Sequence, residues 1–396
     1  MTDQLSEPMT IPTRRDDPLQ PPDRLRRPMP ITRLSFPDGH LGWLVTRHST
    51  ARQVLSDPRF SARQELVHFP VPLPISQRTE PADPGWLVRM DPPDHTRYRR
   101  LLQGQFTTRR LRQLTPRVEK LAEEHLDAME RLGPPVDLVE AYALPIPSLV
   151  ICELLGVPYA DREEFQHHTA MLTRLNTTTD GMMAAVQALG AYVHQLVGRK
   201  RAEAGDDLLS GLVHSGELTD EELTNIAMLL LITGHETTAH MIAHGVYALL
   251  RHDDQLRALR EDPALIDRTV EELLRHLAIV QTGISRAALE DVELEGELVR
   301  AGETVTVWIS NVNRDPDVFD DPDRMDITRV ATGHMSFGHG LHQCMGQPLA
   351  RIEMRTAYQA LFQRFPTLRL AVPPDEIPMR NEMAVYGVQR LPVAWD

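Results

Sequence analysis

The ten-residue string Phe337–Gly346, Phe-Gly-His-Gly-Leu-His-Gln-Cys-Met-Gly, constrains this 396-residue chain more than any other feature. Its glycines let the backbone come close to a flat partner. A helix-forming run with Pro348 in its first turn follows, so we expect the Cys344 sulfur near a helix N-terminus. The unpaired N–H groups and partial positive charge there favour thiolate over thiol. We therefore expect Cys344 to be a thiolate metal ligand beneath a planar group; the alternative is a buried structural cysteine in a glycine-rich turn.

The string resembles the cysteine-ligand loop of the cytochrome P450 monooxygenases, Phe-Gly-x-Gly-x-His-x-Cys-x-Gly, with every fixed position filled. The resemblance covers the chain from about Trp43 to Trp395. It implies haem b (iron protoporphyrin IX) with Cys344 as the metal ligand, and Phe337 and Gly346 among the cofactor-binding residues. It also implies the fold, which is mainly α with small β-sheets, in a single triangular-prism domain with a long central helix.

The bulk composition is that of a globular protein, with 41% hydrophobic and 25% charged residues. The longest apolar run, Ile226–Ile232, is far shorter than the roughly 18 residues that span a bilayer, and no signal peptide is visible. We therefore expect a cytoplasmic monomer that binds no membrane. The net charge of −14 argues against binding to nucleic acid, and two cysteines cannot build a disulfide framework.

The chain divides by composition into two parts. Residues 1–30 are rich in proline and charge and predict an irregular N-terminal arm. Residues 31–396 predict a single domain, because no repeat or flexible linker interrupts them. Helical periodicity dominates residues 94–278, whereas the stretches 291–295 and 303–309 alternate as strands do.

One long helix is predicted near the middle of the chain. Thr219-Asp-Glu-Glu222 is a capping-box signature, and apolar periodicity continues to about Leu250. The centre of this helix, residues 233–238, reads Thr-Gly-His-Glu-Thr-Thr, and its glycine alone costs up to about 1 kcal/mol relative to alanine. Unfavourable residues in the middle of a long helix indicate a functional site.

A zinc-peptidase interpretation of this centre is weak. The motif His-Glu-x-x-His needs two histidines four residues apart, but His240 follows His235 by five and lies about 140° around the helix. His240 and His244 have the right spacing, yet no acid lies between them.

The same segment resembles the oxygen groove of the P450 family. The resemblance implies that Gly234 leaves room for dioxygen, that Thr237 offers a hydroxyl to it, and that Glu236 brings in protons through water. Splitting dioxygen requires two protons delivered while bulk water stays out. Thr233 stands where the family has alanine or glycine, so we expect a narrower groove or an extra bound water.

Two further sets of residues match family positions. The first set is structural and braces the core behind the cysteine loop: Glu272, Arg275 and Arg324. The second set would hold the two haem carboxylates, which need cationic or donor partners when buried: His95, Arg99, Arg286 and His342.

The substrate pocket is expected, by resemblance, to draw on the segments 66–86 and 173–183 and on five named residues: Thr233, Val280, Gly283, Ile284 and Val385. These regions are mostly apolar, which favours a large, mostly neutral ligand. Within the family the chain looks most like actinobacterial enzymes that tailor polyketides, macrolides and terpenoids.

Seven arginines and no acid lie between His95 and Arg117 in an otherwise acidic chain. One interpretation is a solvated helix face; the other is a docking site for an acidic ferredoxin at Arg97–Arg117. The chain has no flavin or iron–sulfur segment of its own, so electrons from NAD(P)H would arrive through a separate reductase and ferredoxin. A haem-thiolate peroxygenase and a non-catalytic haem sensor or carrier are the rival functions, and the pair Glu236-Thr237 argues against both.

Overall fold

The computed structural model describes residues 8–12, 14–25, 29–72, 79–158, 161, 178–203 and 205–396. Within these residues the α-helices are α1 (His48–Ser56), α2 (Asp94–Gln103), α3 (Thr108–Leu132), α4 (Pro145–Leu155), α6 (Thr179–Ala202), α7 (Leu208–Ser215), α8 (Asp220–Arg251), α9 (Asp253–Glu261), α10 (Ile266–Leu277), α11 (Ile309–Val312) and α12 (Gln347–Arg364).

The strands of the described residues are short. They are β1 (Ile31–Ser35), β2 (Leu41–Val45), β3 (Phe60–Ser61), β4 (Val136–Asp137), β5 (Ile284–Ala288), β6 (Val292–Leu294), β7 (Glu297–Val299), β8 (Thr304–Val307), β9 (Arg369–Leu370) and β10 (Pro392–Ala394). They form a five-stranded sheet in the order β1-β2-β8-β5-β3, a three-stranded sheet in the order β4-β10-β9, and the hairpin β6-β7. The prediction of a mainly α fold with small sheets is therefore confirmed.

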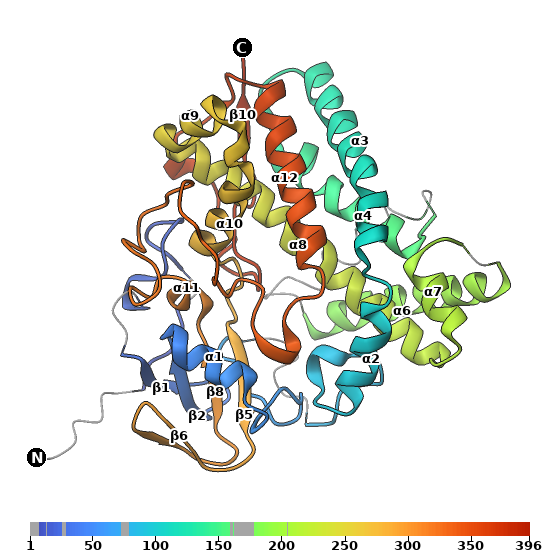
Figure 1. Cartoon of the computed structure of the whole chain (residues 1–396), viewed down its shortest axis with the longest axis vertical. Helices are drawn as coiled ribbons and strands as arrows, with labels where there is room; N and C mark the ends of the chain where they lie inside the picture. Colours follow the sequence, from blue (N-terminus) through green and yellow to red (C-terminus); the bar gives the residue numbers. More distant parts are fainter. Residues whose placement is uncertain are drawn as a thin grey trace, which may run out of the picture.

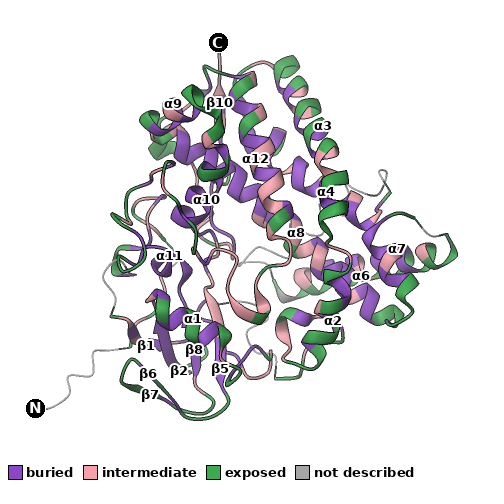
Figure 2. Cartoon of the chain, viewed as in Figure 1, coloured by how far each residue is buried: buried purple, intermediate pink, exposed green. Residues whose placement is uncertain are grey.

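The outline in Figure 1 is roughly triangular, with the larger sheet at one corner and helices over the rest. Helix α8 crosses the middle, packed against α4, α6, α10 and α12, and Figure 2 shows it largely buried. It is long and apolar enough to span a membrane by length and composition, but 72% of its apolar window is buried inside the protein. It is therefore the core helix of this fold.

The start of α8 forms as the sequence predicts. The Thr219 side chain accepts a hydrogen bond from the Glu222 N–H, and the Glu222 carboxylate accepts one from the Thr219 N–H. Glu222 also accepts from the Tyr98 hydroxyl at 2.7 Å and from the Arg97 guanidinium at 2.6 Å, so it ties α2 to α8.

Two glycines of α8 allow close helix packing. A Cβ at Gly245 would overlap the hydroxyl of Tyr358 in α12, which donates to the Met241 carbonyl at 2.6 Å. A Cβ at Gly234 would lie 2.8 Å from Ile151 Cδ1 in α4. A larger residue at position 234 would require the Ile151 side chain to shift, so Gly234 lies in close packing against α4, a contact that the sequence did not reveal.

The N-terminal residues that are described pack onto the domain. Leu19 and Leu25 are buried, and the Met9 N–H donates to the Arg33 carbonyl beside β1. The Leu19 carbonyl accepts from the buried Arg314 guanidinium at 3.0 Å. The division of the chain at residue 30 stays a prediction.

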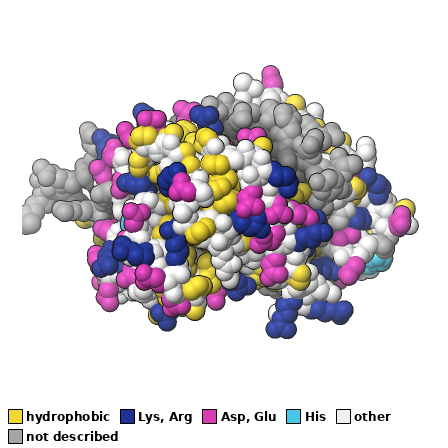
Figure 3. Space-filling view, turned by 90° about the horizontal axis from the view of Figure 1, so that it is seen from above, with side chains coloured by type: hydrophobic (Ala, Val, Ile, Leu, Met, Phe, Trp, Pro, Cys, Tyr) yellow, Lys and Arg dark blue, Asp and Glu magenta, His cyan; other side chains and the backbone are white. Residues whose placement is uncertain are grey.

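The face seen in Figure 3 carries basic and acidic side chains interspersed with apolar ones.

Candidate active site

A cavity of about 430 Å³ lies between the middle of α8, the cysteine loop, α2 and the segment 278–286. Its wall is mostly apolar. Residues of the predicted oxygen groove, haem-carboxylate set, cysteine loop and substrate pocket line it: Thr233, Gly234 and Thr237 from α8, His95 and Arg99 from α2, Val280, Ile284 and Arg286 from the segment before and within β5, and Phe337, His342, Cys344 and Gly346 from the loop.

The cysteine loop is held tightly against the domain. The Cys344 N–H donates to the Phe337 carbonyl at 2.8 Å, and Gly346 caps α12. Gly340 has φ +73°, and a Cβ there would overlap the Leu55 carbonyl oxygen of α1. Only glycine fits this close approach. The Cys344 side chain is exposed to the cavity, which it lines.

The electrostatics at Cys344 act in two directions. Burial raises the pKa of the thiol, while the N–H groups of Gly346 and Gln347 and the guanidiniums of Arg99 and Arg351 lower it. The predicted effect of the helix terminus is therefore present but is outweighed by burial. A bound cation at the sulfur is what makes a buried cysteine a thiolate, since a coordinating thiol is deprotonated.

The four predicted partners of the haem carboxylates lie together at one side of the cavity. Burial lowers the pKa of Arg286 to about 10, and its hydrogen bond within the described structure goes to the Ser285 carbonyl. Neither ring nitrogen of His95 has a hydrogen-bond partner among the described residues, and burial lowers its pKa to about 4. The His95 and His342 rings lie 4.1 Å apart, and burial, then Arg286, His95 and Arg99, lower the His342 pKa to about 2.

Among the described residues, no carboxylate forms an ion pair with these buried donors. The charge of Asp91 acts to raise the pKa of His95 and of Arg286, against the larger lowering effect of burial. The Asp91 carboxylate itself accepts hydrogen bonds from the Ser61 hydroxyl at 2.6 Å and from the Ala62 N–H at 2.8 Å. Buried cations and orphaned donors are costly unless an acceptor satisfies them. The residues present therefore fit a planar group that carries two carboxylates and an iron facing Cys344, as haem b does.

Of the side chains at the centre of α8, the threonines face the cavity and Glu236 lies behind its wall. The Thr237 hydroxyl donates to the Thr233 carbonyl at 3.1 Å, and the Thr233 hydroxyl donates to the Leu229 carbonyl at 2.7 Å. Glu236 is 4% exposed, is not part of the cavity lining, and forms an ion pair of 3.4 Å with Arg380. Glu236 therefore lies behind the cavity wall, whereas the Thr237 hydroxyl lies on it. The hydroxyls of both Thr233 and Thr237 donate their hydrogens to carbonyls of the helix backbone.

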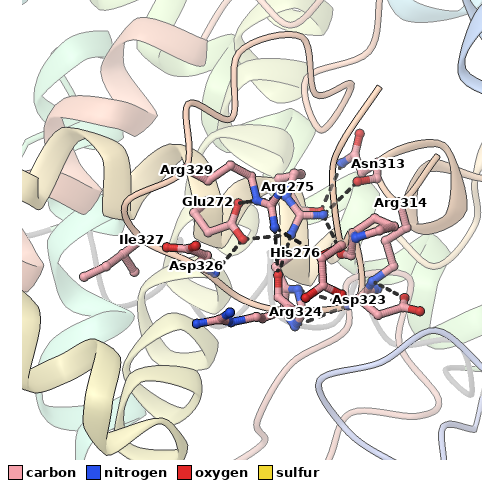
Figure 4. Close-up of polar contacts among 12 residues, drawn as sticks. Glu272, Arg275, His276, Asn313, Arg314, Asp323, Arg324, Asp326, Ile327 and Arg329 are labelled. Carbon is pink, nitrogen blue, oxygen red and sulfur yellow. Dashed lines mark hydrogen bonds and ion pairs between the residues drawn. The ribbon is translucent and has the colours of Figure 1, made fainter. Parts of the chain in front are cut away.

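The structural pair forms as predicted, but its third member differs. Arg275 and Glu272 are fully buried and form a bidentate pair at 2.7 Å. Arg324 contributes only its carbonyl, which accepts from Arg275 at 3.1 Å, because its side chain is exposed. The second guanidinium near Glu272, besides that of Arg275, belongs to Arg329, at 3.4 Å (Figure 4). The prediction that the Arg324 side chain closes the pair is wrong.

The predicted substrate residues are only partly on the cavity. Thr233, Val280 and Ile284 line the cavity, whereas Gly283 and Val385 are not among the described residues that line it. Gly283 has φ +62° and packs against Thr306, and Val385 forms a bridge with Val280 behind the wall. Residues 73–78 and 173–177 of the expected pocket segments lie outside the described residues, and the described parts of 66–86 and 178–183 add no lining residue.

Sequence reasoning missed Glu353 of α12. This carboxyl lines the cavity wall behind the cysteine loop, and burial raises its pKa to about 8. Its Oε2 has no partner among the described residues. The available signal was an acid on a helix face that otherwise carries Leu349 and Met354 into the core.

Five of the seven arginines of the predicted basic patch bind other groups of the same protein, some of them at its surface. Arg97 and Arg100 pair with Glu222 and Glu217, and Arg110 and Arg117 pair with Asp206 and Glu153. Arg99 donates to the Gln343 carbonyl beside Cys344. Arg109 and Arg112 are exposed and form no ion pair with any described residue.

Comparison with known proteins agrees with this geometry. A profile of the cytochrome P450 family matches residues 200–392. Cytochrome P450 105C1 of a Streptomyces species is 54% identical over 392 residues, which are 98% of this chain and 99% of that protein. Pentalenic acid synthase of Streptomyces avermitilis is 44% identical over 99% of this chain and 98% of its own length. The crystal structure of CYP105P1 in complex with filipin I superposes with a TM-score of 0.93 at 42% identity, over 98% of this chain and 99% of that one.

Proposed function

The chain belongs to the cytochrome P450 family of haem-thiolate monooxygenases, and on that premise we propose that it oxidises a large, mostly apolar natural product at a C–H or C=C bond. The observation that carries this proposal is the cavity, whose wall is mostly apolar apart from the α8 threonines and the polar groups around the cysteine loop and the haem-carboxylate set. Such a wall binds by burial of apolar surface and leaves few groups to recognise a charged ligand. A polyketide, macrolide or terpenoid fits this chemistry, in line with relatives named pentalenic acid synthase and vitamin D3 dihydroxylase.

The residues around the cavity have distinct roles in this proposal. Haem, when bound, supplies an iron that activates dioxygen for insertion into the substrate. Cys344 presents its sulfur as the ligand, held by the loop and by the N–H groups of Gly346 and Gln347. Arg99 and Arg286, with the two histidines beside them, bind the carboxylates and fix the orientation of the group.

Proton supply falls to the two neighbouring residues of α8. The Thr237 hydroxyl lies on the cavity wall and donates to the Thr233 carbonyl, so its oxygen is available to accept a hydrogen bond from water in the cavity. Glu236 lies behind the wall, shielded from the substrate, and Arg380 holds its carboxylate. A positioned acid–base group contributes typically about 10²–10⁴-fold to a rate.

Electron supply and location complete the proposal. Electrons come from NAD(P)H through a reductase and an acidic ferredoxin, which docks where Arg109 and Arg112 are exposed. We infer that the protein is a cytoplasmic monomer.

The test is spectroscopic. Reduced protein with carbon monoxide should absorb at the position typical of thiolate haem, and Cys344→Ser should abolish that band. Titration with polyketides and terpenoids should shift the Soret band from low to high spin for a large neutral compound and not for small acids. A normal band in the serine variant would refute the assignment of Cys344 as the iron ligand. A spectral shift that only small acids produce would refute the proposal of a large, mostly apolar substrate.

A further inference from the structure

A polar stripe runs along one face of α8, outward from Glu236. His240 and His244 follow Glu236 at intervals of four residues, and Tyr247 follows three residues later. Side chains at this spacing lie above one another, rising about 6 Å per interval. Glu236, His240, His244 and Tyr247 are 4%, 2%, 0% and 0% exposed, respectively, in a helix whose other buried residues are mostly apolar.

The stripe connects the wall of the active site to the surface. At its inner end Glu236 is held by Arg380, and the next residue, Thr237, lines the cavity. At its outer end the Tyr247 hydroxyl accepts from Arg251 at 2.8 Å, and Arg251 is exposed. No other element of the active site needs a histidine at either position, so the mechanism leaves both unexplained.

The stripe is covered by two irregular segments. Gly387 packs over His240, where a Cβ would lie 3.4 Å from His240 Cβ. The Tyr386 ring packs edge-on against His244 at 5.5 Å, and the Arg15 guanidinium of the N-terminal arm lies 3.8 Å from the Tyr386 ring centre.

Several polar atoms along the stripe lack hydrogen-bond partners among the described residues. They are His240 Nδ1, both ring nitrogens of His244, the Tyr386 hydroxyl and Arg15 Nε. The Pro18 carbonyl acts to raise the pKa of His244, but it forms no hydrogen bond of good geometry with either ring nitrogen. Buried polar groups are nearly always satisfied, and ordered water does so where protein does not. The orphaned atoms of two successive helix positions and of the segments that cover them therefore lie where buried water would complete their hydrogen bonds.

We propose that His240 and His244 form an internal proton route from the protein surface to Glu236. A proton enters from water at the Arg251 end, and each imidazole accepts it at one ring nitrogen as it releases another proton from the second nitrogen. One N–H bond forms and one breaks at each ring, so no oxidant or reductant is needed, and Glu236 regains the proton that it gives to the active site. The inference rests on the proposed role of Glu236.

The surroundings of the stripe keep the rings of His240 and His244 neutral except while a proton is being transferred. Burial and then Arg15 lower the pKa of His244 to about 3, and burial, Arg380 and the neighbouring histidines lower that of His240. The acids that act along the route are Glu236 at the inner end and Asp17 beside Tyr247, and His276 faces it from α10. A proton is therefore attracted to the acid at the inner end and does not rest on the rings.

The experiment uses His240→Gln and His244→Gln in the haem-loaded protein. Glutamine keeps the volume and can bind water, but its amide does not pass protons as an imidazole does. Each variant should lower coupled product formation by at least about tenfold and raise the solvent deuterium isotope effect. The double variant should be no slower than the slower single variant, because the two rings act in series. The carbon monoxide band and the substrate-induced spectral shift should not change.

The matched control is His235→Gln, a buried histidine next to Glu236 whose Nδ1 contacts the Leu231 carbonyl at 2.8 Å, off the stripe. It should keep full coupling. A crystal structure of the unsubstituted protein should show ordered waters between His240, His244 and Tyr386. A dry stripe, additive effects of the two variants, or full coupling in both overturns the route.

Glu236→Gln separates this inference from the proposed function. If that variant slows turnover and the histidine variants do not, only the route fails. If it retains full coupled turnover, the role of Glu236 fails first. Should the glutamine variants not fold, His240→Leu and His244→Leu remove the orphaned ring nitrogens and give the same kinetic comparison.

Discussion

Arg275 and Arg286 are both buried arginines, and their surroundings show how the structure separates a brace from a binding site. The five N–H donors of Arg275 are all used, on Glu272, Asn313, Pro322 and Arg324. Arg286 is 7% exposed and donates to the Ser285 carbonyl, next to unpaired His95. A buried cation satisfied by the protein stabilises the fold, whereas one left unsatisfied indicates where an anionic ligand binds.

The largest effect is expected at the satisfied arginine. Glu272→Gln should lower the free energy of unfolding by about 3–5 kcal/mol, because it leaves Arg275 as an uncompensated buried charge. Chemical denaturation of the haem-free and haem-loaded protein measures this. Arg300→Gln, in the exposed pair with Asp291, is the control and should change stability little, since solvent screens such pairs. Equal stability of the two variants would contradict the brace.

Glu353 extends the comparison to a buried acid that the protein leaves unsatisfied. Its folded pKa of about 8 lies above the ordinary 4.5, so the folded state binds more protons and is stabilised below about pH 4.5. That contribution is lost as pH rises through about 8. Glu353→Gln should therefore be more stable than the unsubstituted haem-free protein by about 4 kcal/mol at pH 8 and nearly equal to it at pH 4.5.

Unfolding curves at several pH values test this prediction. Glu376→Gln, at an exposed acid, should follow the unsubstituted protein at every pH. A gain from Glu353→Gln that is the same at pH 4.5 and pH 8 would show that it does not arise from the ionisation of this carboxyl.

Arg286→Leu should have opposite effects on the haem-free and haem-loaded forms. Without haem, removal of a desolvated cation should leave stability unchanged or increase it. With haem, loss of a charged hydrogen bond of about 1.5–3 kcal/mol should weaken haem affinity roughly 10–100-fold. Transfer of haem to apomyoglobin measures the affinity, and Arg286→Lys, which keeps the charge, should recover part of it. Destabilisation of the haem-free form with unchanged haem transfer would make Arg286 a brace like Arg275.

The sequence predicted the parts of this site that local patterns determine. The cysteine loop, the capping box of α8 and the Glu272–Arg275 pair each lie within one short segment, so their spacing fixes their geometry. Arg329 was missed because the sequence does not distinguish it from Arg324, five residues earlier in the same irregular segment. Which of the two side chains reaches Glu272 depends on the conformation of that segment in the folded protein.

Features set by long-range packing were also beyond the sequence. Glu353 sits at an ordinary helical position, and its isolation depends on the elements packed around it. Gly283 and Val385 were placed in the pocket by resemblance, but the β-bridge between Val280 and Val385 puts the latter behind the wall. The arginine-rich stretch looked uniform in sequence, and the structure engages most of it with acids from α8 and other segments.

The smallest effect is expected at Arg109 and Arg112, where exposed charges have no ion-pair partner among the described residues. Arg99 joins α2 to the loop beside Cys344, so α2 and the adjoining start of α3 lie on the cysteine side, from which electrons would enter. Arg109→Glu with Arg112→Glu should raise the apparent KM for an acidic ferredoxin several-fold at low salt, and less at 0.15 M, where the screening length is about 8 Å. Substrate-induced spectral shifts should stay unchanged. Arg257→Glu, an exposed reversal on α9, is the matched control. Equal ferredoxin dependence in the two proteins would mean that Arg109 and Arg112 form only a solvated face.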